Sequence, residues 1–203
     1  MKLYYSPGAC SLSAHIALCE SGLAFEAIAA PTKTKKLPDG TDYLTINPRG
    51  YVPLLELDDG QRMTEGPAIV QYIADQAPAK HLAPANGTMA RYRLQEWLNF
   101  VGTELHKGCF TLLFNPSVDA ATKATARERL AGRLQWVNGQ LEGKPFVLGE
   151  GFSVADGYLF VVTNWAKPMG VDLAPYPNLL ALRERVAARP GVQAAMKAEG
   201  LLG

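Results

Sequence analysis

The stretch Tyr4-Tyr5-Ser6-Pro7-Gly8-Ala9-Cys10-Ser11-Leu12-Ser13 predicts a strand, a tight turn and the start of a helix. Residues 1–5 are apolar and aromatic, as a buried strand is, and Pro7-Gly8 ends the strand and reverses the chain. Five residues then recur at helical spacing: Leu12, His15, Ile16, Cys19 and Leu23. Cys10 is therefore expected in or just before the first turn of a helix.

A cysteine at the start of a helix is well placed for reactivity. The unpaired backbone N–H groups and the positive end of the helix dipole lower the pKa of a thiol there, and they can also hold an anion. The alternative for Cys10 is a packing role as a small buried residue, which is the commoner role of a single cysteine.

The composition indicates a folded chain without a strong net charge. Its 203 residues are enough for one large or two small domains, and a hydrophobic content of 48% supports real cores. The 20 basic and 19 acidic side chains leave a net charge of +1, which gives no electrostatic case for nucleic acid or an anionic membrane as a partner. A neutral small molecule or a small anion is the expected ligand.

The three cysteines, Cys10, Cys19 and Cys109, show neither C-x-x-C spacing nor a His/Cys metal pattern. We therefore expect reduced thiols in a cytosol, with no disulfide framework and no metal. Polar residues and Pro7-Gly8 interrupt any signal-peptide core, and no apolar run has membrane-spanning length. The expected location is the cytoplasm.

A second short strand over residues 25–30 would complete a β-α-β unit with the first strand and helix. Residues 31–47 form a mostly polar loop that contains Lys33, Lys35 and Lys36. These lysines either lie on a solvated surface or include one that pairs with a carboxylate of a ligand.

The segment from Asn47-Pro48 to Asp59-Gly60 predicts a turn, a strand that begins near Val52-Pro53, and a hairpin back through residues 62–64. If the Val52-Pro53 peptide bond is cis, the Val52 backbone N–H and C=O can face outward. They could then pair with a peptide-like ligand as an added strand would.

A helix is expected to open at Thr64-Glu65-Gly66-Pro67, because proline is tolerated in a first helical turn. Glu65 is either an acid that the helix dipole favours or the partner of an ammonium group on the ligand.

Residues 78–87 are rich in Pro, Ala, Asn and Gly and provide the best domain boundary. The predicted division is residues 1–80, a linker over 81–87, and a helical domain over 88–203. Its helices are expected at residues 88–107, 120–141, 153–166, 179–188 and 192–199.

Two features of the helical domain suggest roles for particular residues. Asn99, Thr103 and His106 lie at positions i, i+4 and i+7, on a helix face next to an apolar stripe, as expected for a helix that borders a cleft. Cys109 is expected just past the end of this helix. His106 is either a cleft residue or a hydrogen-bonded boundary histidine. Ser153 and Asp156 form a capping-box pattern with a structural role.

Taken in order, these motifs resemble the beta class of bacterial cytosolic glutathione transferases. The resemblance rests on residues 5–11, on Asn47-Pro48 with Gly50 and Val52-Pro53, on residues 64–66, and on Asn99 with residues 103–107. It implies an α/β plus all-α architecture, in which a thioredoxin-like N-terminal domain is followed by a helical-bundle C-terminal domain. It also implies a homodimer that binds glutathione in a cleft between the domains.

The resemblance assigns a role to each part of the expected glutathione site. Cys10 would face the glutathione sulfur, with Tyr5 and Ser11 as helpers, and His106 would be a nearby donor or base. The loop before Pro53 would present the backbone of Val52 to the cysteinyl unit of glutathione. Glu65 and Gly66 would hold the γ-glutamyl end, and Lys35 the glycine carboxylate. The helical domain would complete the cleft with Asn99, Thr103, Glu104, Leu105, His106 and Lys107.

Three functions stay open at this point. The first is attack of the glutathione thiolate on an electrophilic, mostly apolar small molecule. The second is thiol transfer or reductive dehalogenation through Cys10, which a cysteine in this position favours. The third is a non-catalytic binding protein of the same fold, which the full set of expected glutathione contacts disfavours.

Overall fold

The computed structural model describes residues 1–202, and its contacts divide the chain into two compact units. The first unit, here called the sheet unit, contains residues 1–83 together with the chain from Arg189 on. The second, the helical unit, contains residues 84–188. The chain was expected to stay in the helical domain from residue 88 to its end, whereas its last helix packs in the sheet unit.

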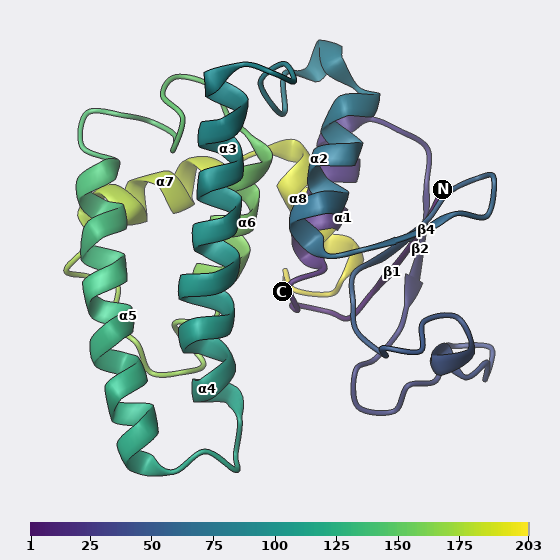
Figure 1. The fold of residues 1–203 in the computed structure, drawn as a ribbon, viewed down its shortest axis with the longest axis horizontal. Coiled ribbons are helices and arrows are strands. Elements are labelled where there is room, and N and C mark those ends of the chain that lie inside the picture. The colour runs from purple at the N-terminus through teal and green to yellow at the C-terminus, as the bar shows by residue number, and fades with distance from the viewer. Residues whose placement is uncertain (203) are drawn as a thin grey trace. The chain divides into compact units, whose positions relative to one another are not determined.

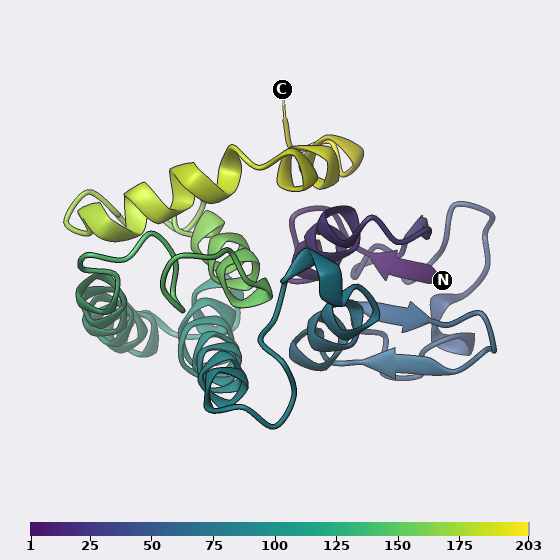
Figure 2. The same ribbon diagram turned by 90° about the horizontal axis from the view of Figure 1, so that it is seen from above.

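A four-stranded mixed sheet forms the centre of the sheet unit, with strand order β2-β1-β3-β4. β1 (Lys2–Tyr5) pairs parallel with β2 (Glu26–Ala29) and antiparallel with β3 (Leu54–Glu56). β4 (Arg62–Thr64) returns antiparallel beside β3 through the predicted Asp59-Gly60 turn (Figure 2). This arrangement confirms the predicted strands and the thioredoxin-like topology.

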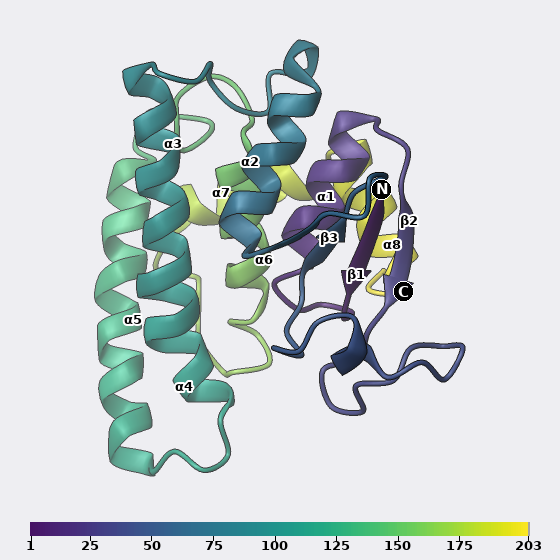
Figure 3. The ribbon, with the colours of Figure 1, turned by 45° about the vertical axis from the view of Figure 1, so that its right-hand side comes forward.

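Helices α1 (Leu12–Ser21), α2 (Gly66–Gln76) and α8 (Pro190–Ala198) pack together in this unit. Residues 12–18 of α1 are all buried, because the helix is covered by β1, α2 and α8 rather than on one face only. Gly22 ends α1 in the left-handed conformation, with its N–H on the carbonyl of Leu18. Figure 3 shows α8, in yellow, alongside the purple α1.

Short 3₁₀ turns complete this unit. One, Tyr43–Thr45, lies in the long loop between β2 and β3, and the other, Pro78–Lys80, follows α2. The ring of Tyr43 is fully buried and packs 5.7 Å from that of Tyr4, which anchors the loop to the sheet.

The helical unit contains α3 (Met89–Phe100), α4 (Thr111–Phe114), α5 (Ala120–Gln140), α6 (Val154–Asn164) and α7 (Pro177–Ala187) (Figure 1). Its core includes the predicted stripe of the first of these helices: Leu94, Trp97, Leu98, Val101 and Leu105. No helix in residues 1–202 has the length and apolar character needed to cross a bilayer.

The helix predicted for residues 88–107 is longer than expected. A π-helical segment, Val101–Phe110, joins α3 to α4, so the helical path continues to residue 114. Cys109 was expected just past the helix, but it lies inside this segment and is fully buried. The apolar residues Cys109, Phe110 and Leu113 extend the buried face, which explains why the helix does not stop at residue 107.

Candidate active site

Cys10 lies in the turn between β1 and α1, two residues before the first helical residue. Ala9 closes the turn by donating its N–H to the Ser6 carbonyl at 3.0 Å, and the Cys10 carbonyl accepts from the N–H of Ser13 at 3.2 Å. The side chain of Cys10 is partly exposed. This confirms its predicted position at the helix start.

Ser11 closes the loop that carries the thiol. Its Oγ accepts the N–H of Ser6 at 3.1 Å and donates to the Ser6 carbonyl at 3.2 Å, and the residue is fully buried. Ser11 was expected as a helper near the glutathione sulfur. Its hydroxyl is instead occupied with the backbone that shapes the loop.

The Cys10 thiol lies beside the backbone of Val52. Its Sγ donates to the Val52 carbonyl at 3.3 Å, although 42 residues separate the two in the chain. The Val52-Pro53 peptide bond is cis. A hydrogen bond from the S–H favours the neutral thiol, whereas the positive end of the α1 dipole favours the thiolate, so these two features of the surroundings act in opposite directions.

Two side chains fix the loop that precedes Val52. The hydroxyl of Tyr43 and the amide of Asn47 both donate to the carbonyl of Tyr51, each at 2.8 Å. Asn47 and Tyr43 are themselves buried, so the donors are held firmly in place although Tyr51 is exposed. The sequence showed Asn47 only as part of a motif, and the structure explains its role as the support of the Val52 backbone.

Glu65 and Gly66 lie at the start of α2, near the same loop. A Cβ added at Gly66 would lie 3.8 Å from both the Pro53 ring and the Ser13 hydroxyl, so the α2 start, the Pro53 loop and the α1 start converge. Glu65 has a φ of +71°, a backbone conformation that non-glycine residues rarely adopt and that concentrates at functional sites. Its exposed carboxylate lies 3.3 Å from the guanidinium of Arg49.

Lys35 also has a positive φ, of 55°, and its ammonium group donates to the carbonyl of Gly50. The side chain therefore folds back on the loop that leads to Val52. Lys33 and Lys36 are exposed. Of the three lysines, Lys35 is the one that the structure brings close to the Val52 loop.

Tyr5, expected as a helper of the thiol, lies against a different group. Its ring is 5.4 Å from that of His15 on α1. Burial, and to a lesser degree the charge of Glu199, raises the pKa of Tyr5 above 10.0. The phenol is therefore protonated near neutral pH and cannot act there as a base.

The predicted site residues of the helical unit lie on the α3 helix end and the π-helical segment. Asn99, Thr103 and Lys107 are exposed. Leu105 is fully buried, so its side chain belongs to the core, and the carboxylate of Glu104 binds Arg133 of α5 at 2.9 Å.

His106 lies in an aromatic environment. Its Nδ1 is 2.8 Å from the hydroxyl of Tyr158, and its ring is 4.9 Å from that of Trp165. Burial, with a smaller contribution from the charge of Lys107, lowers the pKa of His106 from 6.5 to about 4. The imidazole is therefore neutral at physiological pH and can offer a neutral hydrogen bond but no positive charge.

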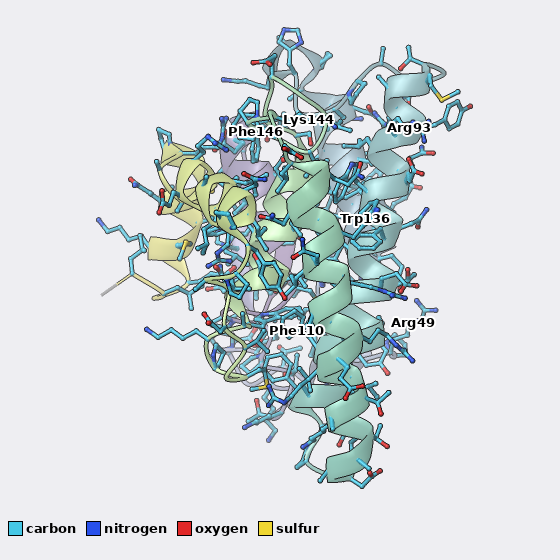
Figure 4. All side chains as sticks on the ribbon, turned by 90° about the vertical axis from the view of Figure 1, so that its left-hand side faces the viewer. Arg49, Arg93, Phe110, Trp136, Lys144 and Phe146 are labelled. Atoms are coloured by element: carbon cyan, nitrogen blue, oxygen red, sulfur yellow. The ribbon has the colours of Figure 1, made fainter. Side chains whose placement is uncertain are left out.

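A cavity of about 530 Å³ opens elsewhere on the helical unit. Trp97 and Phe100 of α3 pack against Trp136 of α5 in its wall, with ring centroids 5.2 and 4.6 Å from that of Trp136. Arg93 and Lys144 also line it (Figure 4). Asn99, Thr103 and His106 do not line this cavity, so it is separate from the cleft that these residues were expected to border.

The surroundings of the other two thiols, those of Cys19 and Cys109, make them less reactive than Cys10. Burial, with the nearby charges of Glu20 and Glu199, raises the pKa of Cys19 to about 11. Burial also raises the pKa of Cys109 above 9.0. Within residues 1–202, no three His, Cys, Asp or Glu side chains gather as a metal site would require.

The fold and this site define a class of protein. A thioredoxin-like unit with a partly exposed cysteine at its first helix start, beside the Val52 backbone at the entry of β3, is suited to thiol chemistry on a peptide-like substrate.

Comparison with known proteins agrees with this class. Residues 8–76 match the family model "Glutathione S-transferase, N-terminal domain", and residues 102–190 match "Glutathione S-transferase, C-terminal domain". The curated glutathione S-transferase GstA of Escherichia coli O157:H7 is 46% identical over 201 residues, which cover 99% of this chain and 100% of that protein.

Two solved structures are similarly close. A sphingomonad glutathione S-transferase in complex with glutathione has a TM-score of 0.95 and 49% identity, covering 99% of this chain and 100% of that one. The beta-class enzyme of Sphingomonas chungbukensis has the same TM-score and identity, covering 100% of both chains.

The chain therefore belongs to the glutathione S-transferase family and is close to its bacterial beta class. It is an enzyme that conjugates glutathione to electrophiles. The predicted family, fold and enzymatic function are confirmed.

Proposed function

We propose that the sheet unit binds glutathione with its sulfur beside Cys10, and that Cys10 supports the reaction directly. The observation that carries this proposal is the 3.3 Å contact between the Cys10 thiol and the Val52 carbonyl. It puts a partly exposed thiol next to a backbone that Tyr43 and Asn47 hold in place through Tyr51. A tripeptide that pairs with the backbone of Val52 would bring its own cysteine close to Cys10.

The two ends of glutathione require opposite charges. Its γ-glutamyl end carries an ammonium group, for which the exposed carboxylate of Glu65 is a suitable partner once it leaves Arg49. At the start of α2, the backbone N–H of Gly66 is the proposed donor to the α-carboxylate, because Pro67 has no N–H and those of Ala68 and Ile69 donate to the Glu65 carbonyl. Lys35, which bends toward the Val52 loop, is the proposed partner of the glycine carboxylate.

In the conjugation reaction, glutathione loses its thiol proton, its sulfur forms a bond to the electrophilic carbon, and the leaving group departs with the bonding electrons. The positive end of the α1 dipole, which lies at the helix start beside Cys10, favours the thiolate. His106 is neutral at physiological pH, so its proposed part is a hydrogen bond rather than a charge. Asn99, Thr103 and Lys107 are proposed to contact the substrates, whereas Leu105 and Glu104 would act through the packing of their own unit.

Thiol transfer is a second candidate function, because the thiol of Cys10 is partly exposed at a helix start. Cys10 thiolate would attack the glutathione sulfur of a disulfide between glutathione and another thiol, forming a Cys10–glutathione disulfide and releasing the other thiol as its thiolate. A second glutathione thiolate would then attack the glutathione sulfur of that mixed disulfide, releasing oxidised glutathione and restoring Cys10. In reductive dehalogenation, glutathione thiolate would displace the halide and form a thioether. Cys10 thiolate would then attack the glutathione sulfur of that thioether, and the carbon would leave with the bonding electrons and take up a proton. The same second step would resolve the resulting Cys10–glutathione disulfide.

Further proposals concern the whole protein. We infer a cytoplasmic homodimer that serves in detoxification, with glutathione binding in residues 1–80, a linker over 81–87, and the second-substrate pocket in the helical domain. Sedimentation at micromolar concentration should give about twice the chain mass of 21.9 kDa. A species at the mass of one chain would contradict the homodimer.

One set of assays tests these functions together. The protein should be retained on immobilised glutathione, and its turnover of an aromatic chloride, a chlorinated acid and a mixed disulfide should then be compared for the wild type and Cys10→Ala. Loss of mixed-disulfide turnover alone assigns thiol transfer to Cys10. If the substitution changes neither retention nor any turnover, Cys10 has only a packing role and the proposal fails.

A further inference from the structure

The corner between α6 and α7 contains an arginine whose hydrogen-bond acceptors are all neutral. Arg183 of α7 reaches the last turn of α6, where its Nη1 donates to the hydroxyl of Thr163 at 2.6 Å and its Nη2 to the amide oxygen of Asn164 at 2.9 Å. Nη1 also donates to the carbonyl of Phe160 at 3.4 Å, and the guanidinium carbon lies 5.5 Å from the centre of the Phe160 ring. Within residues 1–202, no carboxylate forms an ion pair with Arg183.

The surroundings of Arg183 compensate its charge only in part. Burial lowers the pKa of Arg183 below its ordinary value, but a guanidinium stays charged at physiological pH. The negative end of the α6 dipole, which lies at Asn164, and the face of the Phe160 ring both favour a cation. These are partial charges, whereas a cation removed from water is normally paired with an acid. Arg183 can therefore accept an anion in addition to its contacts with α6.

Arg183 lines a cavity of about 400 Å³ on the helical unit. Volumes of this size are typical of small-molecule sites. The chain that follows α6 forms the wall of the cavity, to which it contributes three apolar side chains: Ala166, Val171 and Leu173. The other charged residues of the lining, Lys167 and Asp172, are exposed.

Backbone contacts fix the shape of this wall. The N–H of Val171 donates to the carbonyl of Ala166 at 2.9 Å, which closes the turn. Arg127 of α5 donates to the carbonyl of Met169 at 2.8 Å, so the same turn is also attached to a third helix. Because the turn is already ordered, binding a ligand there would cost little conformational entropy.

We propose that this cavity binds a small monocarboxylate with an apolar body, whose carboxylate pairs with Arg183. A guanidinium has five N–H donors in a planar arrangement that matches a carboxylate, and the contacts with α6 occupy only part of this set. The apolar body would lie against the three apolar side chains of the wall.

The charges of the lining favour a singly charged anion. Arg183 and Lys167 are cations and Asp172 is an acid, which leaves one positive charge for the ligand to balance. A second negative charge on the ligand would be repelled by Asp172. None of the residues proposed to contact glutathione or the electrophile lines this cavity, so the proposal does not depend on the role of Cys10.

The test is calorimetry of the full chain with cyclohexanecarboxylate as the probe. Saturating S-hexylglutathione is added to block the proposed glutathione and second-substrate sites. The wild type should bind the probe and should bind the neutral cyclohexanecarboxamide about tenfold or more weakly, because a charge-assisted hydrogen bond is lost. Arg183→Gln should weaken binding of the carboxylate by a similar factor, about tenfold or more. Asp172→Asn should strengthen it by about threefold, because it removes a like charge near the ligand.

Arg185→Gln is the matched control. Arg185 lies on the same helix and is exposed, and it does not line this cavity, so its substitution removes the same charge without touching the proposed site. This variant should bind the probe as the wild type does. A loss as large as that of Arg183→Gln would show that only net charge matters and would refute the proposal.

Three further outcomes would also refute the proposal. One is the absence of probe binding to the wild type at millimolar concentration, and another is displacement of the probe by S-hexylglutathione. The third is a folded Arg183→Gln variant that has a lower melting temperature but unchanged affinity, which would show that Arg183 only caps α6. If Arg183→Gln does not fold, Asp172→Asn and Lys167→Gln decide, because both residues are exposed and their substitutions should change the affinity in opposite directions. Unchanged affinity in both variants would then refute the proposal.

Discussion

Replacing Asp156 by Ala should destabilise the helical unit strongly, because one buried carboxylate satisfies three donors. Asp156 accepts the N–H of Val147 at 2.8 Å, the N–H of Ser153 at 2.8 Å and the hydroxyl of Ser153 at 2.7 Å. Asp156 is fully buried, and Val147 and Ser153 are 4% and 2% exposed. The predicted capping box is confirmed, and it also ties the preceding loop to α6.

The expected loss follows from the donors that the substitution leaves without an acceptor. Each of the two buried N–H groups and the buried Ser153 hydroxyl costs about 1 kcal/mol when it loses its acceptor, so the total is about 3 kcal/mol. For a chain of this size, that corresponds to a fall of about 6–12 °C in melting temperature.

Tryptophan fluorescence is a suitable assay, because Trp97, Trp136 and Trp165 all lie in the helical unit. Urea unfolding followed by this signal should show an earlier midpoint for Asp156→Ala. Asp119→Ala is the matched control: Asp119 caps α5 through the N–H of Thr122 but is exposed, so its loss should be smaller. Equal midpoints for wild type and Asp156→Ala, or equal losses for the two variants, would refute the reasoning.

The pH dependence of the same site has a definite sign. Burial, against the opposing hydrogen bonds, raises the pKa of Asp156 from 3.8 to about 6. Between these values the folded protein binds a proton that the unfolded chain does not, so this group's contribution to stability falls as pH rises from about 4 to about 6 and is constant above that range. The difference amounts to about 3 kcal/mol. Asp156→Asn, which cannot titrate, should lack this dependence when the two unfolding profiles are compared.

The remaining predictions concern the thiol site and its neighbours. Glu65→Gln should weaken glutathione binding in calorimetry and leave the melting temperature unchanged. Glu65→Gly should also weaken binding but raise stability by about 1 kcal/mol, because glycine adopts the positive φ without strain. If neither variant changes the affinity, Glu65 is only a surface acid. Peptide mapping after treatment with oxidised glutathione should find Cys10 modified before Cys19, whose raised pKa keeps it protonated; the reverse order would contradict the assignment. Between pH 5.5 and 8, the conjugation rates of the wild type and of His106→Asn should depend on pH in the same way, because the pKa of His106 is about 4. An inflection that is present in the wild type and absent in His106→Asn would show that this pKa is not depressed.

Local patterns in the sequence were enough to predict most of the strands and helix starts of the sheet unit. The strand at residues 62–64 was predicted with its observed bounds, because a hairpin turn fixes where the return begins. The start of α1 after Cys10 followed from Pro7-Gly8 and the helical spacing beyond it. These features depend on residues a few positions apart, which is the range over which propensity and periodicity act.

Such local patterns could not predict contacts between distant segments. Glu199 and His15 are 184 residues apart, and neither has a local signal that would pair them. The packing of α8 in the sheet unit could not be predicted for the same reason, because the α8 sequence is as compatible with a helical bundle as with packing on α1. The role of Tyr158 beside His106 also depends on a contact across 52 residues.

The π-helical segment changes the interpretation of the polar strip on this helix. Asn99, Thr103 and His106 would share one face of a regular α-helix, but the wider turns of residues 101–110 alter the direction of each later side chain. Thr103 stays exposed, whereas His106 turns partly inward to Tyr158 and loses the positive charge that a solvated histidine could carry. In the proposed site, His106 would then offer a thiolate no positive charge, and the positive end of the α1 dipole lies beside Cys10. Under the proposed role of Cys10, the geometry of its turn should therefore matter more to catalysis than the protonation of His106.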